Sequence, residues 1–171
     1  MLRLGLVTGT SGNVSARDGD FVLITPASAP YEQMSEEDLV TLGDGGEPGE
    51  REGTPSTEWR VHLAIYAARP DVAAIVHTHS VQATAWSFLD EPLHTGTEEL
   101  EAAIGGAVLT APYAPTGSEE IANAAADALG DRSAVLLGRH GVVGVGATPA
   151  GALATCVVVE RQAQIAWLLR R

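Results

Sequence analysis

Residues 72–79 read Val-Ala-Ala-Ile-Val-His-Thr-His, an apolar run that turns polar at its end. Such a run is typical of a buried strand. Side chains two residues apart on a strand point to the same face, about 6.5–7 Å apart along the chain. The stretch therefore predicts a core strand that presents His77 and His79 on one face.

Helical patterns flank this strand. Before it, residues 54–58 read Thr-Pro-Ser-Thr-Glu, a helix start that Ser56 or Thr57 is expected to cap. Glu58 then lies in the first turn, and Pro70 ends the helix. The other predicted elements are strands at 21–25, 107–110, 133–137 and 142–145, helices at 81–89, 118–129 and 149–171, and a glycine-rich solvated loop at 43–53. Strands that alternate with helices predict an α/β fold with a central sheet covered by helices, and alternation alone suggests parallel strands.

Length and composition favour a single soluble domain. The 171 residues are 45% hydrophobic and 19% charged, as in globular proteins. No apolar run reaches the roughly 18–20 residues of a membrane span, and no signal-peptide pattern develops at the start. The single cysteine excludes an internal disulfide and a cysteine zinc site. We therefore expect one cytoplasmic domain over residues 1–171 that does not bind a membrane.

The charge balance restricts the ligands. Ten basic and twenty-two acidic residues give a net charge of −12, which argues against nucleic acid as a partner. The chain contains no lysine. An anionic substrate would need positive potential from helix N-termini, backbone amides or a metal ion.

Three histidines are candidate metal ligands. His77 and His79 can both bind one Zn²⁺ at about 2.0–2.1 Å, although two solvent-facing histidines would give the same pattern. His140 lies between two apolar strands in Gly138-Arg139-His140-Gly141, where the glycines permit a tight turn. It is either structural or a third ligand. Three imidazoles would leave a fourth position open, as in catalytic metal sites.

Glu58 has two interpretations. An acid in the first helical turn interacts favourably with the helix dipole, by about 0.3–1 kcal/mol. Beside a metal, the same carboxylate can fill the fourth position and shuttle a proton. His62, one turn further on, and His94, in a loop, have no partner evident from the sequence and are interpreted as structural or exposed.

Two segments are candidate anion sites. Thr10-Ser11-Gly12-Asn13 combines small hydroxyls with backbone amides, but it lacks the lysine of a P-loop and does not match G-x-G-x-x-G. Ser56 and Thr57 at a helix start offer a second anion position, with ordinary N-capping as the alternative.

Five motifs follow one another along the chain. They are Gly9-Thr10-Ser11-Gly12-Asn13-Val14-Ser15, Leu23-Ile24-Thr25-Pro26, Pro55-Ser56-Thr57-Glu58-Trp59-Arg60, Val76-His77-Thr78-His79 and His140-Gly141. In order and spacing this set resembles the class II aldolase/adducin family, and within it the L-fuculose-phosphate aldolase branch. The resemblance covers essentially the whole chain and is far more specific than any one motif.

The resemblance implies a three-layer α/β/α fold around a mainly antiparallel sheet. It implies zinc-dependent cleavage of a ketose 1-phosphate, such as L-fuculose 1-phosphate, to dihydroxyacetone phosphate and an aldehyde, in a homotetramer. The resemblance implies that His77, His79 and His140 bind one Zn²⁺ per chain, with Glu58 as resting-state ligand and acid/base. The residues that it implies for phosphate binding are Gly12, Asn13, Ala27, Ser28, Ser56 and Thr57.

The chain departs from the family pattern in the substrate pocket and at its ends. The aldolases usually carry Thr-Gly where Ala27-Ser28 stand, so one hydroxyl has moved by a residue. Residues 93–101 contain no tyrosine, whereas the aldolases use one there. The domain is also expected to lack the family's N-terminal helix and its C-terminal tail, which carries a second catalytic tyrosine.

Other activities of the same family stay open. A pentulose 5-phosphate 4-epimerase would share His77-Thr78-His79-Ser80, but such enzymes typically have a shorter acid at the position of Glu58. A sugar-phosphate dehydratase is a further enzymatic alternative. A non-catalytic, adducin-like interaction module would be expected to lose metal ligands, and here all four candidates are present.

Overall fold

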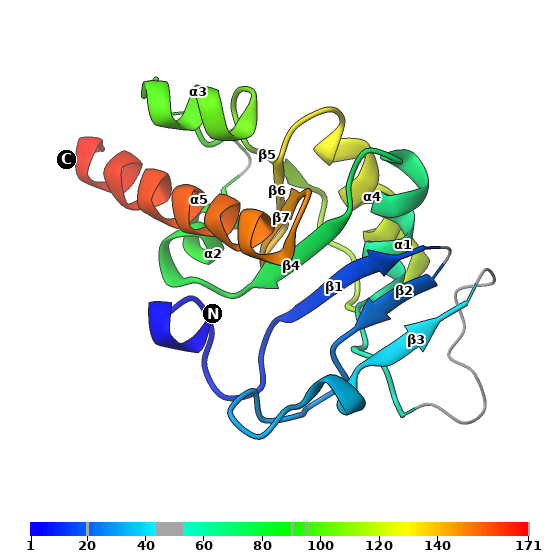
Figure 1. Cartoon of the computed structure of the whole chain (residues 1–171). Coiled ribbons are helices and arrows are strands. Elements are labelled where there is room, and N and C mark those ends of the chain that lie inside the picture. Colours follow the sequence, from blue (N-terminus) through cyan, green and yellow to red (C-terminus); the bar gives the residue numbers. More distant parts are fainter. Residues whose placement is uncertain (20, 44–52, 90, 95, 171) are drawn as a thin grey trace.

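A seven-stranded sheet forms the centre of the protein (Figure 1). This computed structural model describes residues 1–19, 21–43, 53–89, 91–94 and 96–170. The strands are β1 Asn13–Asp18, β2 Phe21–Ile24, β3 Val40–Leu42, β4 Ala74–Thr78, β5 Leu109–Ala111, β6 Ala134–Leu137 and β7 Gly141–Gly146. They lie in the order β3-β2-β1-β4-β7-β6-β5, and only β5 and β6 pair in parallel. The mainly antiparallel sheet is confirmed, and the parallel sheet suggested by alternation alone is wrong.

Helices cover both faces of the sheet, which is therefore the middle of three layers (Figure 1). One face carries α1 (Trp59–Ala68) and α4 (Glu119–Leu129), and the other carries α2 (Val81–Trp86), α3 (Glu98–Ile104) and α5 (Pro149–Leu169). Two short 3-10 segments are η1 (Leu2–Leu4) and η2 (Glu36–Asp38). The predicted loop at 43–53 lies outside the described residues, apart from its two end glycines.

The buried side chains form two hydrophobic cores, one on each face of the sheet. In β6, Val135 and Leu137 join the core under α1 and α4, whereas Ala134 and Leu136 join the core under α5. Successive side chains of a strand point to opposite faces, so a strand buried on both faces is apolar throughout. We call these the α1-side core and the α5-side core.

The interior strand β1 was not predicted. Its residues Val14 and Ala16 pack against the α5-side core, while Asn13 and Ser15 point to the other face and are 2% and 1% exposed. Polar residues at positions that a strand normally fills with apolar ones hide the strand pattern. They are buried because they are hydrogen-bonded beneath α1.

Helix α1 begins one step later than the sequence suggested. Glu58 itself is the N-cap residue, so the prediction that Ser56 or Thr57 caps the helix is wrong. Residues 54–57 pair with the chain after β2 instead: Pro26 and Pro55 form a β-bridge, and the Ser56 N–H donates to the Thr25 carbonyl at 3.0 Å. This pairing brings residues 26–28 and 56–58 together.

Helix α5 is long and apolar enough to cross a membrane, judged by length and composition alone. It packs along the sheet, however, and Ala152, Val159 and Ala163 are fully buried in the α5-side core. The core helix of a soluble protein passes the same length test. Cys156, in the same helix, is also fully buried, and its Sγ donates to the Val76 carbonyl at 3.4 Å.

Candidate metal centre

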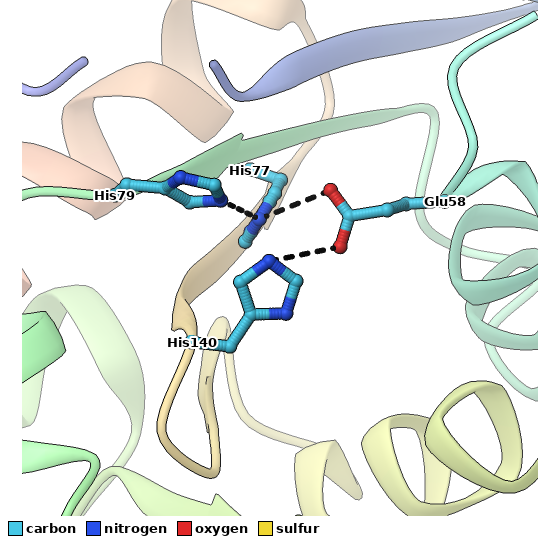
Figure 2. A group of neighbouring side chains, drawn as sticks. All are labelled: Glu58, His77, His79 and His140. Carbon is cyan, nitrogen blue, oxygen red and sulfur yellow. Dashed lines mark hydrogen bonds and ion pairs between the residues drawn. The ribbon is translucent and has the colours of Figure 1, made fainter. Parts of the chain in front are cut away.

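Four potential ligands converge at the ends of strands in the middle of the sheet (Figure 2). His77 is near the end of β4, His79 directly follows that strand, His140 lies in the turn between β6 and β7, and Glu58 begins α1. Their nearest ligand atoms all lie within 4.8 Å of one another. Pairing of β4 with β7 places the His140 turn beside the His77–His79 strand end, although the two are distant in sequence.

The contacts within this cluster are short. The Nε2 atoms of His77 and His79 lie 2.8 Å apart. Glu58 Oε2 lies 3.2 Å from His77 Nε2, and Glu58 Oε1 lies 3.3 Å from His140 Nε2. Figure 2 shows all four side chains pointing to one common centre.

The histidines are held in the form that binds metals. Burial lowers the pKa of His77, His79 and His140 to about 4, so they are neutral at pH 7. The His77 Nδ1–H donates to the Val142 carbonyl at 3.0 Å, which leaves the Nε2 lone pair for a ligand. A cation fits this centre, because Glu58 Oε1 is buried and has no hydrogen-bond partner.

Glycine at position 141 permits this close packing. A Cβ atom there would collide with the Thr78 carbonyl and lie 3.1 Å from the rings of both His77 and His79. The side chain of any other residue would therefore push the ligands apart. The sequence predicted a tight turn at the glycines around His140, and the structure shows that Gly141 packs against Thr78, His77 and His79.

A cavity of about 300 Å³ opens beside the centre. It is lined by Thr10, Ser11, Gly12, Asn13, Pro26, Ala27, Ser28, Ser56, Thr57, Glu58, His79, Thr116 and His140. All six residues predicted to bind phosphate are among them, next to three of the four candidate metal ligands; His77 lies behind. Six of the lining residues carry hydroxyl groups and none is an arginine.

The loop that forms one wall of the cavity is fixed by a residue that the sequence reasoning missed. The Tyr31 hydroxyl donates to the carbonyls of Gly12, at 2.5 Å, and Ser11, at 3.1 Å. Gly12 has φ +78°, and a Cβ atom there would lie 2.6 Å from the His77 carbonyl. On the opposite wall, Ser28 adopts φ 58°, a left-handed conformation that glycine favours. Thr116 was also missed, because no pattern connects it to the other cavity residues.

His62 and Asn13 contact each other behind Glu58. The Asn13 Nδ2–H donates to Glu58 Oε2 at 2.9 Å, and Asn13 Oδ1 lies 2.6 Å from His62 Nε2. His62 is thus a buried residue with hydrogen-bond partners. Its position one turn after Glu58 in the sequence could have indicated a place near the site. His94 is exposed, with Nδ1 3.8 Å from the Glu101 carboxylate.

The fold and the four clustered side chains define an α/β protein with the ligand set of a metalloenzyme. The chain belongs to the class II aldolase and adducin family: the family model described as "Class II Aldolase and Adducin N-terminal domain" matches residues 1–167.

Named relatives are aldolases, which are carbon–carbon lyases. The chain is 43% identical over 165 residues to L-fuculose phosphate aldolase of Escherichia coli O6:H1, covering 96% of this chain and 76% of that protein. It is 38% identical over 165 residues to 5-methylthioribulose-1-phosphate/5-deoxyribulose-1-phosphate aldolase of Rhodospirillum rubrum, covering 96% and 74%. A solved structure of an L-fuculose 1-phosphate aldolase superposes with a TM-score of 0.93 at 35% identity, covering 99% of this chain and 80% of that one.

Proposed function

We propose that this protein is a zinc-dependent aldolase that cleaves a ketose 1-phosphate to dihydroxyacetone phosphate and an aldehyde. The observation that carries the proposal is the three-histidine, one-carboxylate cluster, which opens onto a cavity lined by hydroxyl groups. The Rhodospirillum rubrum relative and the superposed solved structure are both named for a sugar phosphorylated at position 1. A small-molecule sugar phosphate is therefore the substrate class.

Zinc suits this donor set. Neutral imidazoles and a carboxylate are ligands that Zn²⁺ prefers, and His77, His79 and His140 would hold it with Glu58 as the fourth group. Bound there, zinc would supply Lewis-acid stabilisation of negative charge on the substrate oxygens. Its charge also offsets the lack of arginine in the cavity lining.

Glu58 is the proposed acid/base. As the C3–C4 bond of a ketose 1-phosphate breaks, the C4 hydroxyl passes its proton to the Glu58 carboxylate and becomes the aldehyde. The bonding electrons stay on the fragment that carries the phosphate, as an enediolate. Transfer of a proton from Glu58 to C3 of this fragment completes dihydroxyacetone phosphate, and the reverse transfer starts condensation. Glu58 lines the cavity and contacts His77 and His140, which supports this role.

The phosphate is proposed to bind between the two walls of the cavity. Gly12 and Asn13 on one side, and Ala27 and Ser28 on the other, offer backbone and hydroxyl groups. The remaining proposed contacts, Ser56 and Thr57, precede α1, where the positive end of the helix dipole favours an anion. A structure with bound phosphate tests this location, and an anion held on arginines away from the histidines would contradict it.

Metal content tests the ligand assignment. His79→Ala should lower zinc per chain at least about tenfold, since it removes one of three imidazoles from the centre. His94→Ala is the matched control, because His94 is exposed, contacts Glu101 and is not part of the four-residue cluster. Equal zinc in both purified variants, measured by mass spectrometry of the metal, would contradict the assignment.

Product analysis tests the activity. The zinc-loaded protein is incubated with L-fuculose 1-phosphate, 5-methylthioribulose 1-phosphate and 5-deoxyribulose 1-phosphate, and dihydroxyacetone phosphate is measured. Release from at least one is expected. Conversion of a pentulose 5-phosphate to its 4-epimer without net cleavage, or loss of water from a sugar phosphate, would instead favour the epimerase or dehydratase. No turnover of any of them would favour a binding module.

Assembly and location belong to the same proposal. The family resemblance implies a cytoplasmic homotetramer, with active sites near the interfaces between subunits. Light scattering of the purified protein tests the assembly, and a mass of one or two chains would contradict it.

A further inference from the structure

A chain of buried polar groups leads from Glu58 into the protein beneath α1. The Glu58 carboxylate accepts from Asn13, whose Oδ1 lies 2.6 Å from His62 Nε2. His62 Nδ1 lies 2.6 Å from Ser15 Oγ, which in turn lies 2.9 Å from the Tyr66 hydroxyl. All five residues are at most 6% exposed, so water does not replace these contacts. Each polar group depends on its neighbour for a hydrogen bond.

The donor and acceptor groups of these residues fix the direction in which their hydrogen bonds run. A carboxylate only accepts, so the Asn13 amide turns its NH₂ to Glu58 and its oxygen to His62. His62 Nε2 lies 2.6 Å from that oxygen, which only accepts, so the ring carries a proton on Nε2. Because burial lowers the pKa of His62 to about 3, the ring is neutral and this is its single N–H. Its Nδ1 accepts, so Ser15 donates to it and receives the Tyr66 O–H in return. Every proton points toward Glu58.

The alternative arrangement is costly. If His62 carried its proton on Nδ1, the bare Nε2 would face the Asn13 oxygen, and the amide would have to rotate by half a turn. The Asn13 oxygen would then face the Glu58 carboxylate, which places two acceptors together in a buried site. The tautomer of His62 and the orientation of the Asn13 amide are thus coupled, and the Ser15 hydroxyl proton stabilises the Nε2 tautomer by donating to Nδ1.

Outside the ligand cluster, the Asn13 amide is the group that holds the Glu58 carboxylate. As the N-cap of α1, its side chain makes no hydrogen bond to its own helix. Its Oε1 has no hydrogen-bond partner, and its Oε2 is held by Asn13. With Oε2 held by Asn13, Oε1 is directed toward His140.

We propose that Ser15 and His62 are positioning residues, which act through Asn13 to fix the orientation of the Glu58 carboxylate for proton transfer. This inference rests on the proposed aldolase activity for its effect on turnover. Neither residue lines the cavity or belongs to the four-ligand cluster. A proton can reach a carbon atom only from a narrow range of directions, so loss of orientation lowers kcat more than substrate binding.

Turnover distinguishes positioning from a merely structural role. Ser15→Ala should lower kcat about 10–100-fold, with KM and zinc content within about twofold of the unchanged protein. Ser15→Thr, which keeps the hydroxyl, should recover most of the loss. The matched control is Thr155→Val, which removes a buried, hydrogen-bonded hydroxyl from α5 on the other face of the sheet. Equal losses of kcat in Ser15→Ala and Thr155→Val would overturn the proposal.

The histidine tautomer provides a readout that does not depend on activity. In zinc-loaded protein with ¹⁵N-labelled histidine, long-range ¹H–¹⁵N spectra should show His62 protonated on Nε2 and bare on Nδ1. Its signals are assigned by their absence in His62→Gln. Ser15→Ala should change this tautomer or mix it with the other. A proton on Nδ1 in the unchanged protein would overturn the relay, whereas the expected tautomer without aldolase turnover would contradict only the proposed function.

Discussion

Burial of the clustered histidines determines what they can bind. Solvent exclusion lowers the pKa of His77, His79 and His140 to about 4, well below the usual 6.5. Protons therefore compete little with a metal at neutral pH, because the imidazoles are already deprotonated. The same burial makes the metal-free protein sensitive to acid.

We expect the free energy of unfolding of the metal-free protein to fall as the pH is lowered from about 6.5 to about 4. Unfolded histidines take up protons near pH 6.5, whereas the folded chain excludes them until about pH 4, and at His62 until about pH 3. The unfolded state binds more protons in this window, so stability rises with pH and is lost on acidification. Denaturant titrations across this range measure the effect.

The His62→Gln variant is the internal control for this dependence. Removing one fully buried histidine should reduce the slope of unfolding free energy against pH by up to about 1.4 kcal/mol per pH unit. An unfolding free energy that stays constant between pH 6.5 and 4 in the unchanged protein would show that the histidines titrate alike in both states.

Replacement of Glu58 by Gln separates its two interpretations. As an acid at a helix start it would contribute under about 1 kcal/mol, and turnover would be nearly intact. As the proton donor it supplies roughly 10²–10⁴ in rate, so kcat should fall at least about 10²-fold. Zinc should be retained, because three histidines remain. Turnover and metal content are measured on the same preparation.

The control for Glu58→Gln is Glu101→Gln, which changes an exposed carboxylate of α3 near His94. It should leave both turnover and zinc unchanged. Near-normal turnover of Glu58→Gln would place the acid/base elsewhere and leave Glu58 as a helix-start acid.

The turn between β6 and β7 depends on glycine at its last position. Gly141→Ala should lower the free energy of unfolding by about 1–3 kcal/mol, because the added methyl group must displace the rings of His77 and His79. Zinc affinity should fall with it, since the ligands move apart. Calorimetry and metal titration measure the two effects.

Gly43→Ala is the matched glycine substitution, since a Cβ atom there meets no atom within 4 Å. It should change neither stability nor zinc affinity appreciably. If Gly141→Ala behaved like Gly43→Ala, the close packing around the histidines would not limit the site.

Most apolar elements were predictable from the sequence, whereas the short strand β3 and the more polar β1 and α3 were not. Strand β4 was found because its residues are buried on both faces and apolar. Strand β1 was not predicted, because the burial of Asn13 and Ser15 depends on partners in α1 that only the fold brings near. Helix α3 was missed as well: its N-cap residue Thr97, which accepts from the Leu100 N–H, follows a segment without periodicity.

The candidate site, too, was only partly predictable from the sequence. Its ligands and cavity residues were recognised from motifs, because each motif keeps chemically distinctive residues at fixed spacing. Tyr31, Thr116 and the Ser15–His62 relay were not, because each acts by a contact between segments distant in sequence.

The whole molecule should unfold as one unit, because strands of the sheet contribute to both cores. Ile65→Ala in the α1-side core and Leu100→Ala in the α5-side core should each cost about 2–5 kcal/mol. Both should shift a single calorimetric transition, whereas Leu4→Ala, at a side chain that is 56% exposed, should shift it little. Two transitions that respond separately would contradict the expectation of one domain.

The buried thiol of Cys156 in α5 can report local opening of the native protein. Cys156 is the only cysteine in the chain, and burial raises its pKa to about 12. Because the thiolate is the form that reacts, a thiol reagent can modify native protein only when the helix lifts from the sheet. The labelling rate, compared with that of unfolded chain, therefore yields the free energy of that local opening without any engineered probe.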